Sequence, residues 1–407
     1  MLDVRMICHL WELGDEGPEA VLDRLQGELG VTGITVPVAC PPLARLRTGP
    51  GSAGRVFRSG GGLFFAPRPT YYQATRCQPP VAAWLRNRNP LADLAEQCAR
   101  RDLPCRVVVS AATLGLLASR QPQVAVRNVF DDPAPDRVCL VNPDVQALIG
   151  GICRDLTEGY PLAGIELAEF HAGRTGQTPA ACEAPFDLGI GGNGLLNICF
   201  CASCRQLGLE AFATNLLDAE AACRSAKTRL EAALETGRPI TQPLDQLVTD
   251  DEALKPYLDA QWHALARCLD SVTRDGGRAI TLHVYDDLIR PSPDGHPLIR
   301  DGGVPGIHAL STSAPFDSQV GLEDAAIAIR QLAGDRMRCE LQVRPNVAPP
   351  ADDQAPDAQF LVRSLNRLAE LGIAAVNLDG YGRWPTRLWP ELRQAIRFAR
   401  RTAPTKD

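Results

Sequence analysis

Short apolar segments alternate with amphipathic helical segments along almost the whole length of this chain. A strand, a loop, an amphipathic helix and then another strand form the repeating pattern of parallel βα units. Eight such strands are counted, and eight units are the number that closes a barrel. They span residues 3–9, 32–38, 104–110, 162–168, 278–285, 305–311, 337–344 and 372–378.

The pattern predicts an α/β fold, a (β/α)8 TIM barrel that forms a single domain over residues 1–407. Barrels of this class run from about 200 to over 400 residues, so one domain of this length is allowed. Two stretches interrupt the rhythm and predict insertions after strands 2 and 4, at about 45–80 and 171–236. The second contains GIGGNG, which lacks a preceding strand and a following Lys-Ser/Thr, so a flexible turn is favoured over a phosphate loop. A doubly wound sheet with an extra domain is the alternative fold.

Net charge and hydropathy limit the kinds of molecule that we expect this protein to bind. The net charge is −6, and no Lys/Arg cluster alternates with aromatic residues, so nucleic acid is not expected as a partner. No apolar run approaches the roughly 18 residues that a membrane helix needs, and the first residues do not resemble a signal peptide. These observations predict a cytoplasmic protein with a small-molecule partner and no membrane partner. A homo-oligomer is left open.

Three cysteines packed into six residues form the sharpest local motif. Cys199, Cys201 and Cys204 have the C-x-C-x-x-C spacing that lets three sulfurs converge on one tetrahedral ion. Most of the 14 cysteines are expected to be reduced, and clustered reduced thiols favour a metal over a disulfide framework. Three unligated thiols and an iron–sulfur cluster are the alternatives. The spacing does not choose the fourth ligand among Cys139, Cys153, His171 and Cys182.

The stretch CFCASCRQLGLEAF resembles the zinc knuckle that follows strand 4 in family 42 glycoside hydrolases. The upstream segment Cys139-Leu-Val-Asn-Pro143 resembles that family's Cys-Pro-Asn-Ser-Pro segment, whose Cys supplies the remaining zinc ligand. A group of uncharacterised glycosyl-hydrolase-like bacterial barrels is similar in the same places. The resemblance implies a structural zinc held by Cys139, Cys199, Cys201 and Cys204.

Polar residues gather where the predicted strands end, which is where barrel enzymes place their reactive groups. Carboxylates with aromatic neighbours suit sugar hydrolysis, which needs two carboxyl groups across the scissile bond. Structural roles for the histidines, a cap role for Asp286 and a packing role for the tryptophans are the alternatives. The expected substrate-binding residues are His9, Trp11, His171, His283, Tyr285, Asp286, Arg344, Tyr381 and Trp384.

Four carboxylates are the catalytic candidates. The resemblance implies an acid/base Glu at the end of strand 4, which Glu169 matches although Ala168 replaces the family's Asn. It implies a nucleophile Glu on strand 7, where Glu340 is the only Glu. Strand alternation turns Glu166 into the barrel, either as a proton donor or as a carboxylate paired with Arg344 or a neighbouring strand. Asp379, at the end of strand 8, is the alternative second carboxylate.

The sequence therefore predicts a glycoside hydrolase-like barrel that acts on a carbohydrate through carboxylate general acid/base chemistry, with a structural zinc. The alternatives are a noncatalytic carbohydrate-binding barrel, or a barrel lyase or isomerase acting on a small polar substrate.

Overall fold

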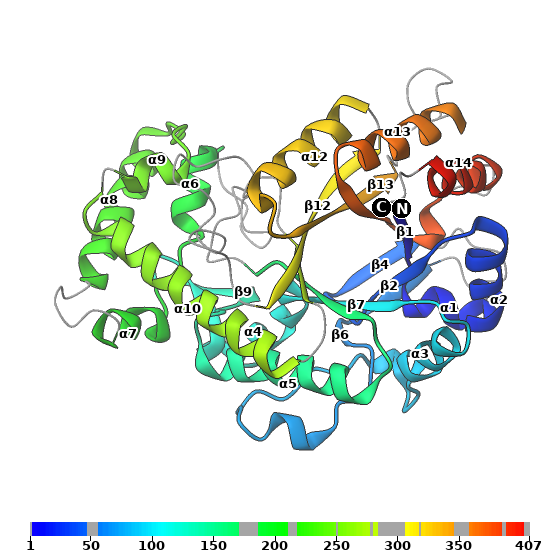
Figure 1. Ribbon diagram of the computed structural model, residues 1–407. Coiled ribbons are helices and arrows are strands. Elements are labelled where there is room, and N and C mark those ends of the chain that lie inside the picture. Colours follow the sequence, from blue (N-terminus) through cyan, green and yellow to red (C-terminus); the bar gives the residue numbers. More distant parts are fainter. Residues whose placement is uncertain are drawn as a thin grey trace.

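Eight parallel strands close into a barrel in the spatial order β1-β14-β13-β12-β11-β10-β7-β2 (Figure 1). The predicted TIM barrel is confirmed. The computed structural model describes residues 2–46, 56–170, 186–210, 218–249, 251–276, 280–283, 306–316, 319–345, 358–384 and 388–402. The barrel strands are β1 (Asp3–Ile7), β2 (Gly33–Pro37), β7 (Cys105–Ser110), β10 (Gly164–Ala168), β11 (Ile280–His283), β12 (Ile307–Phe316), β13 (Arg338–Pro345) and β14 (Ile373–Leu378).

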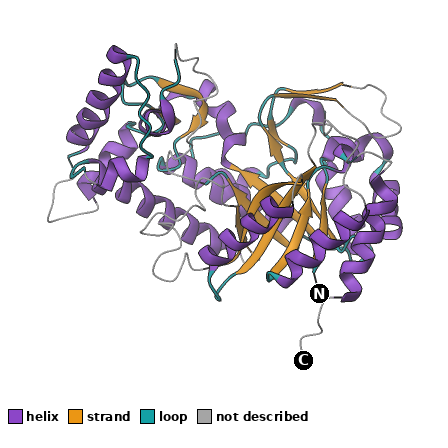
Figure 2. Ribbon diagram, turned by 90° about the horizontal axis from the view of Figure 1, so that it is seen from above, coloured by secondary structure: helices purple, strands orange, loops and turns teal. Residues whose placement is uncertain are grey.

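Helices surround the barrel, and a second group of helices lies to one side of it (Figure 2). The helices that accompany the barrel are α1 (Leu10–Glu16), α2 (Pro18–Leu22), η1 (Asp23–Leu29), α3 (Pro90–Arg100), α4 (Gly115–Arg120), α5 (Pro143–Gly159), α10 (Leu254–Gly276), α12 (Gln319–Ala333), α13 (Ala358–Glu370) and α14 (Trp389–Thr402). None of the described helices combines the length and the apolar character that a bilayer-spanning helix needs.

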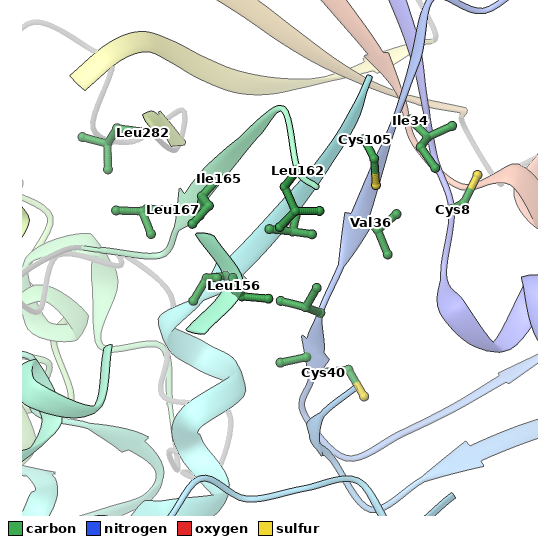
Figure 3. Close-up of a cluster of buried hydrophobic side chains, with 14 of the residues drawn as sticks. Cys8, Ile34, Val36, Cys40, Cys105, Leu156, Leu162, Ile165, Leu167 and Leu282 are labelled. Carbon is green, nitrogen blue, oxygen red and sulfur yellow. The ribbon is translucent and has the colours of Figure 1, made fainter. Parts of the chain in front are cut away.

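The apolar core lies between the barrel wall and the helices. Because side chains alternate along a strand, Ile165 and Leu167 of β10 face outward, and so do Ile34 and Val36 of β2. Figure 3 shows these side chains together with Leu156 of α5 and several thiols in one cluster. All of them are fully buried, so the thiols act there as small apolar side chains.

The lower layer of the barrel interior contains a buried group of paired charges. Arg5 of β1 donates to Glu340 of β13 at 2.9 Å, and Arg106 of β7 donates to both Glu340 carboxylate oxygens at 2.9 and 2.7 Å. Arg106 also donates to Thr281 of β11. These four residues come from alternate strands, as expected for one layer of a TIM-barrel interior. Glu340 thus holds two guanidinium groups inside the barrel.

The next layer comes from the other four strands and is also polar. Thr35 of β2 and Asn377 of β14 are hydrogen-bonded at 3.1 Å. Ser311 of β12 donates to Glu166 of β10 at 3.0 Å. Paired polar groups therefore fill these two layers of the barrel interior, where branched apolar side chains are usual. The mouth of the barrel lies beyond them, toward the carboxyl ends of the strands.

The connection between β2 and β7 folds back over the barrel as small strands. These are β3 (Ala39–Cys40), β4 (Leu43–Leu46), β5 (Val56–Ser59) and β6 (Gly62–Leu63), with the antiparallel pairs β3·β6 and β4·β5. Phe57 of β5 stacks on Trp11 at 4.5 Å and meets the edge of Trp84 at 5.8 Å. Aromatic packing therefore holds this hairpin against the first helix.

A second hydrophobic cluster lies outside the barrel. It is formed by β8 (Ala125–Arg127), β9 (Pro133–Val138), α6 (Gly189–Leu196), α7 (Ala202–Glu210), α8 (Ala219–Thr236), α9 (Leu244–Thr249) and the first turns of α10. The long helix α10 joins the two cores, since Tyr257 and Leu258 belong to this cluster, whereas Leu265 and Leu269 belong to the barrel core.

The prediction of a flexible turn at GIGGNG is wrong. These residues open helix α6. A Cβ at Gly191 would lie 2.2 Å from the carbonyl oxygen of Gln242, and one at Gly194 would lie 2.9 Å from Cβ of Leu244. The glycines therefore allow α6 to pack closely against the segment before α9. Packing of the α6 backbone against the segment from Gln242 to Leu244 favours the helix more than the low helix propensity of glycine disfavours it. The sequence does not reveal this contact.

We expect Glu340→Gln to destabilise the fold by about 3–5 kcal/mol, because it leaves two buried guanidinium groups without a carboxylate. The free energy of unfolding, measured by chemical denaturation, tests this. The matched control is Glu323→Gln, which removes the carboxylate of a surface pair with Arg367 at 3.2 Å and should change stability far less. Equal effects of the two substitutions would contradict the structural role of Glu340.

Candidate functional site

Glu169 follows β10 at the mouth of the barrel in a conformation that is rare for its residue type. Its φ is +63°, in the left-handed region that non-glycine residues seldom adopt. The hydroxyl of Ser110, at the end of the neighbouring strand β7, donates to the Glu169 carboxylate. A strained backbone that directs a half-buried carboxylate toward a neighbouring strand end is typical of functional sites.

Glu166 lies deeper, in a hydrogen-bonded group beneath the mouth. Its carboxylate accepts from Ser311 at 3.0 Å and lies 3.1 Å from Nδ1 of His283. Burial raises the pKa of Glu166, but the hydrogen bond and charge of His283, the charge of Arg106 and the hydrogen bond of Ser311 lower it further, so the pKa falls below its usual value. Glu166 is inside the barrel, as strand alternation predicted, and is held as an anion.

His283 links this buried group to the rim. Its Nδ1 lies 2.8 Å from the hydroxyl of Ser311, and its Nε2 lies 3.1 Å from that of Ser313. Ser313 in turn donates to Gln342 of β13 at 3.3 Å. A chain of hydrogen bonds therefore runs from Glu166 up to polar groups near the carboxyl ends of β12 and β13.

On the opposite side of the mouth, two guanidinium groups pair with Asp379 and a third contacts His9. Arg383 donates to Asp379 at 2.8 Å, and Nε of Arg344 lies 3.5 Å from the same carboxylate. Arg45, from the β4–β5 hairpin, lies 2.9 Å from Nε2 of His9. Burial and the charge of Arg383 lower the pKa of Arg45. We call Arg45, Arg344 and Arg383 the arginine cluster.

Glu12 lies beside the arginine cluster, in the first turn of α1. Its carboxylate accepts the backbone N–H of His9 at 2.9 Å. Burial raises the pKa of Glu12 to about 7, and the hydrogen bond from His9 and the charges of Arg45 and Arg383 only partly oppose it. A carboxyl group that titrates near neutral pH at a barrel mouth has the property that acid/base chemistry requires.

The structure brings some of the predicted site residues together and separates others. His9, His283, Arg344, Glu169 and Asp379 lie at or just below the mouth. Trp11, Tyr381 and Trp384 are buried at 3%, 3% and 2% exposure, and Trp11 stacks on His9 at 4.1 Å, so they support the rim and offer no open face for a sugar. Predictions at His171, Tyr285 and Asp286 lie outside the described residues.

Glu340 was expected near the reacting groups but lies in the lower barrel layer, 2% exposed and paired with Arg5 and Arg106. The sequence does not pair Glu340 with either arginine, because it does not show which strands face each other. Arg45, Arg383 and Ser110 were also missed. Alternation in Leu43–Leu46 gives no signal for Arg45, because it groups the apolar Ala44 and Leu46 on the opposite face, yet that face is the exposed one.

Four cysteines form a separate group inside the second hydrophobic cluster. The sulfur atoms of Cys139, Cys199, Cys201 and Cys204 all lie within 4.8 Å of one another, and those of Cys139 and Cys204 are 3.4 Å apart. All four residues are buried. In a tetrahedral site with metal–sulfur bonds of about 2.3 Å the sulfurs are about 3.8 Å apart, so this group could hold a metal ion. Cys153 packs instead in the barrel core.

Backbone hydrogen bonds fix the cysteine-bearing loop. The carbonyl of Cys199 accepts from the hydroxyl of Tyr257 and from Nε2 of Gln261, both at 2.7 Å. Phe200 stacks on Tyr257 at 5.0 Å. Cys139 is held by its N–H to the carbonyl of Val124 at 2.8 Å. The backbone at Cys139 and Cys199 is thus held in place by its neighbours, as a structural metal site needs.

No family of known proteins and no curated protein matches this sequence. Among solved structures, the chain is similar to α-L-fucosidase isoenzyme 2 from Paenibacillus thiaminolyticus, with a TM-score of 0.52 and 12% identity over 98% of this chain and 49% of that one. The β-N-acetylhexosaminidase from Bacteroides fragilis has a TM-score of 0.45 and 11% identity over 97% and 65% of the two chains. A broad specificity endoglucanase from an uncultured bacterium has a TM-score of 0.44 and 12% identity over 95% and 84%.

These structural neighbours are glycoside hydrolases with a barrel fold, and at such identities the likeness shows the fold alone. The chain spans about half the length of the fucosidase and 65% of that of the hexosaminidase. The resemblance to family 42 in particular stays a prediction.

The raised pKa of Glu12 has a consequence for stability. Because the folded state binds this proton more tightly than the unfolded state, the contribution of Glu12 is greatest below pH 4.5 and is lost as the pH rises toward 7. Relative to Glu12→Gln, which keeps an acceptor for the His9 N–H, the wild type should lose on the order of 2–3 kcal/mol between pH 4.5 and 7.5. Denaturation of both proteins across this range tests it. The exposed Glu28→Gln serves as the control, and a constant difference between wild type and Glu12→Gln would contradict the assignment.

Proposed function

We propose that this protein is a carbohydrate-acting barrel of the glycoside hydrolase type, in which Glu169 donates the proton and Asp379 is the second carboxylate. The observation that carries the proposal is the pair of carboxylates that follow β10 and β14, the fourth and eighth strands, at the same mouth. Glycoside hydrolysis needs two carboxyl groups on either side of the scissile bond.

The surroundings of each carboxylate support these roles. The left-handed backbone conformation at Glu169 is unfavourable by about 1–2 kcal/mol. The structure keeps this conformation at the rim, where the Glu169 carboxylate accepts a hydrogen bond from Ser110. Asp379 is oriented by Arg383 and Arg344. Glu166 is held as an anion inside the barrel and Glu340 is paired with two arginines, so neither is assigned to proton donation.

The structural neighbours support a sugar as the substrate class, since their names describe enzymes that act on fucosides, N-acetylhexosaminides and glucans. The alternatives from the sequence are a noncatalytic sugar-binding barrel, or a lyase or isomerase acting on a small polar substrate. All these functions would use the same barrel mouth, but they give the carboxylates different roles. Measuring hydrolysis rates of the wild type and of carboxylate variants can therefore distinguish them.

Hydrolysis of a panel of aryl glycosides tests the assignment of Glu169 and Asp379. We expect Glu169→Gln to lower kcat/KM by about 10²- to 10⁴-fold on phenyl glycosides, and less on nitrophenyl glycosides, whose better leaving group needs less protonation. Asp379→Asn should lower the rate on both substrates. The exposed Glu96→Gln should leave the rate unchanged.

Unchanged hydrolysis in both variants would exclude these two carboxylates. Sugar binding by a wild-type protein that hydrolyses no glycoside would favour the noncatalytic alternative.

We also propose that the four-cysteine group holds a structural zinc ion. A buried set of four thiolates prefers a tetrahedral ion such as zinc and leaves no open position for a substrate. The ion would tie Cys139, which follows β9, to the loop and first turn of α7 that carry the other three ligands. It would therefore stabilise the second hydrophobic cluster and take no part at the mouth.

Elemental analysis of protein purified without chelators should give about one zinc per chain. Cys201→Ser should lose the metal and lower the thermal midpoint, because metal binding contributes to folding. Cys153→Ser, which changes a buried thiol outside the group, should keep the metal. Iron in the wild type, or no metal, would contradict the zinc assignment.

A further inference from the structure

Among the described residues, the arginine cluster has more positive charges than directly paired carboxylates. Arg344 and Arg383 pair with the carboxylate of Asp379 and Arg45 contacts His9, so these three cations have one carboxylate as a direct partner among the described residues. Glu12 is a further acidic group beside Arg45 and Arg383 in the described part of the chain, and it is only partly ionised at neutral pH. A group of charges of one sign attracts a ligand of the opposite sign.

Arg45 is held in the cluster by the packing of its hairpin. In the β4–β5 register Arg45 lies opposite Phe57, which stacks on Trp11 and meets the edge of Trp84. The next residue of the hairpin, Arg58, is exposed and lies on the other face. The packing of the hairpin therefore holds Arg45 beside His9, which it contacts at 2.9 Å, although the charge of Arg383 lowers the pKa of Arg45.

His9 adds a hydrogen-bond donor with no acceptor among the described residues. Its Nε2 faces the guanidinium of Arg45 at 2.9 Å and therefore accepts, so Nδ1 carries the proton of the neutral ring. Burial and the charges of Arg45 and Arg383 lower the pKa of His9, which keeps the ring neutral. Nδ1 is buried without a partner in the part of the chain that the structure describes, and a buried donor of this kind calls for an acceptor.

We propose that the arginine cluster and His9 bind an anionic group of the substrate, a carboxylate or a sulfate or phosphate ester, so that the carbohydrate is an acidic sugar. Guanidinium groups bind such planar or tetrahedral oxyanions through paired, charge-assisted hydrogen bonds. The cluster combines the carboxyl ends of β13 and β14 with the hairpin after β2, beside the proposed second carboxylate Asp379. This inference names the substrate class of the proposed function and rests on it.

Binding measurements separate this inference from hydrolysis. The probes are D-glucuronate and D-galacturonate, their neutral counterparts D-glucose and D-galactose, and inorganic sulfate and phosphate, each titrated calorimetrically at constant ionic strength. We expect the wild type to bind a uronate, or one of the two inorganic ions, at least tenfold more tightly than the neutral sugars. Arg45→Gln and the half-exposed Arg344→Gln should each weaken that binding by about 10- to 100-fold. Arg58→Gln, on the exposed face of the same hairpin, should not.

The outcomes distinguish the two proposals. Preference for a uronate supports a carboxylate substrate, whereas binding of sulfate or phosphate that depends on Arg45 supports an ester, even if no sugar is hydrolysed. Neutral sugars that bind as tightly as uronates, with no effect of Arg45→Gln, would overturn the acidic-sugar inference and leave the carbohydrate function standing. Absence of binding by every anion would also overturn it.

Discussion

The pairing of the first strand with the last is the constraint on which this structure depends. Residues 3–6 of β1 pair in parallel with residues 375–378 of β14, which closes the sheet and leaves no open edge in the barrel. The same pairing places the segment after β1, with His9 and Glu12, beside the segment after β14, with Asp379 and Arg383. Groups separated by almost the whole chain therefore share one mouth.

The way in which polar side chains are paired inside the barrel differs between the lower layer, the middle layer and the mouth. In the lower layer, Arg5, Arg106 and Glu340 satisfy one another, so the charges stabilise the barrel only as a complete set. In the middle, Glu166, Ser311 and His283 form a hydrogen-bonded group that is still closed. At the mouth, Arg344 and Arg383 share the carboxylate of Asp379, and one buried His9 nitrogen lacks an acceptor among the described residues. Ligand chemistry is expected where pairing is incomplete.

The four-cysteine group and the mouth are different kinds of site. The cysteines lie in the second hydrophobic cluster among apolar side chains, and the hydroxyl of Tyr257 holds the carbonyl of Cys199 in place. The mouth is lined by carboxylates, guanidinium groups and hydroxyls from at least five strand ends. Helix α10 packs against both cores, so the stability of the cysteine-bearing region and the integrity of the barrel wall are physically connected.

Local patterns in the sequence were sufficient for the barrel and for three of the four clustered thiols. Strand and helix periodicity is set by neighbours in the chain, and Cys199, Cys201 and Cys204 are close in space because they are close in sequence. Side-chain alternation likewise placed Glu166 inside. The partners of Glu340, the surplus of arginines around Asp379 and the packing of the α6 glycines depend on contacts between residues far apart in the chain. Barrel closure and helix packing determine those contacts, so patterns within short stretches of sequence cannot predict them.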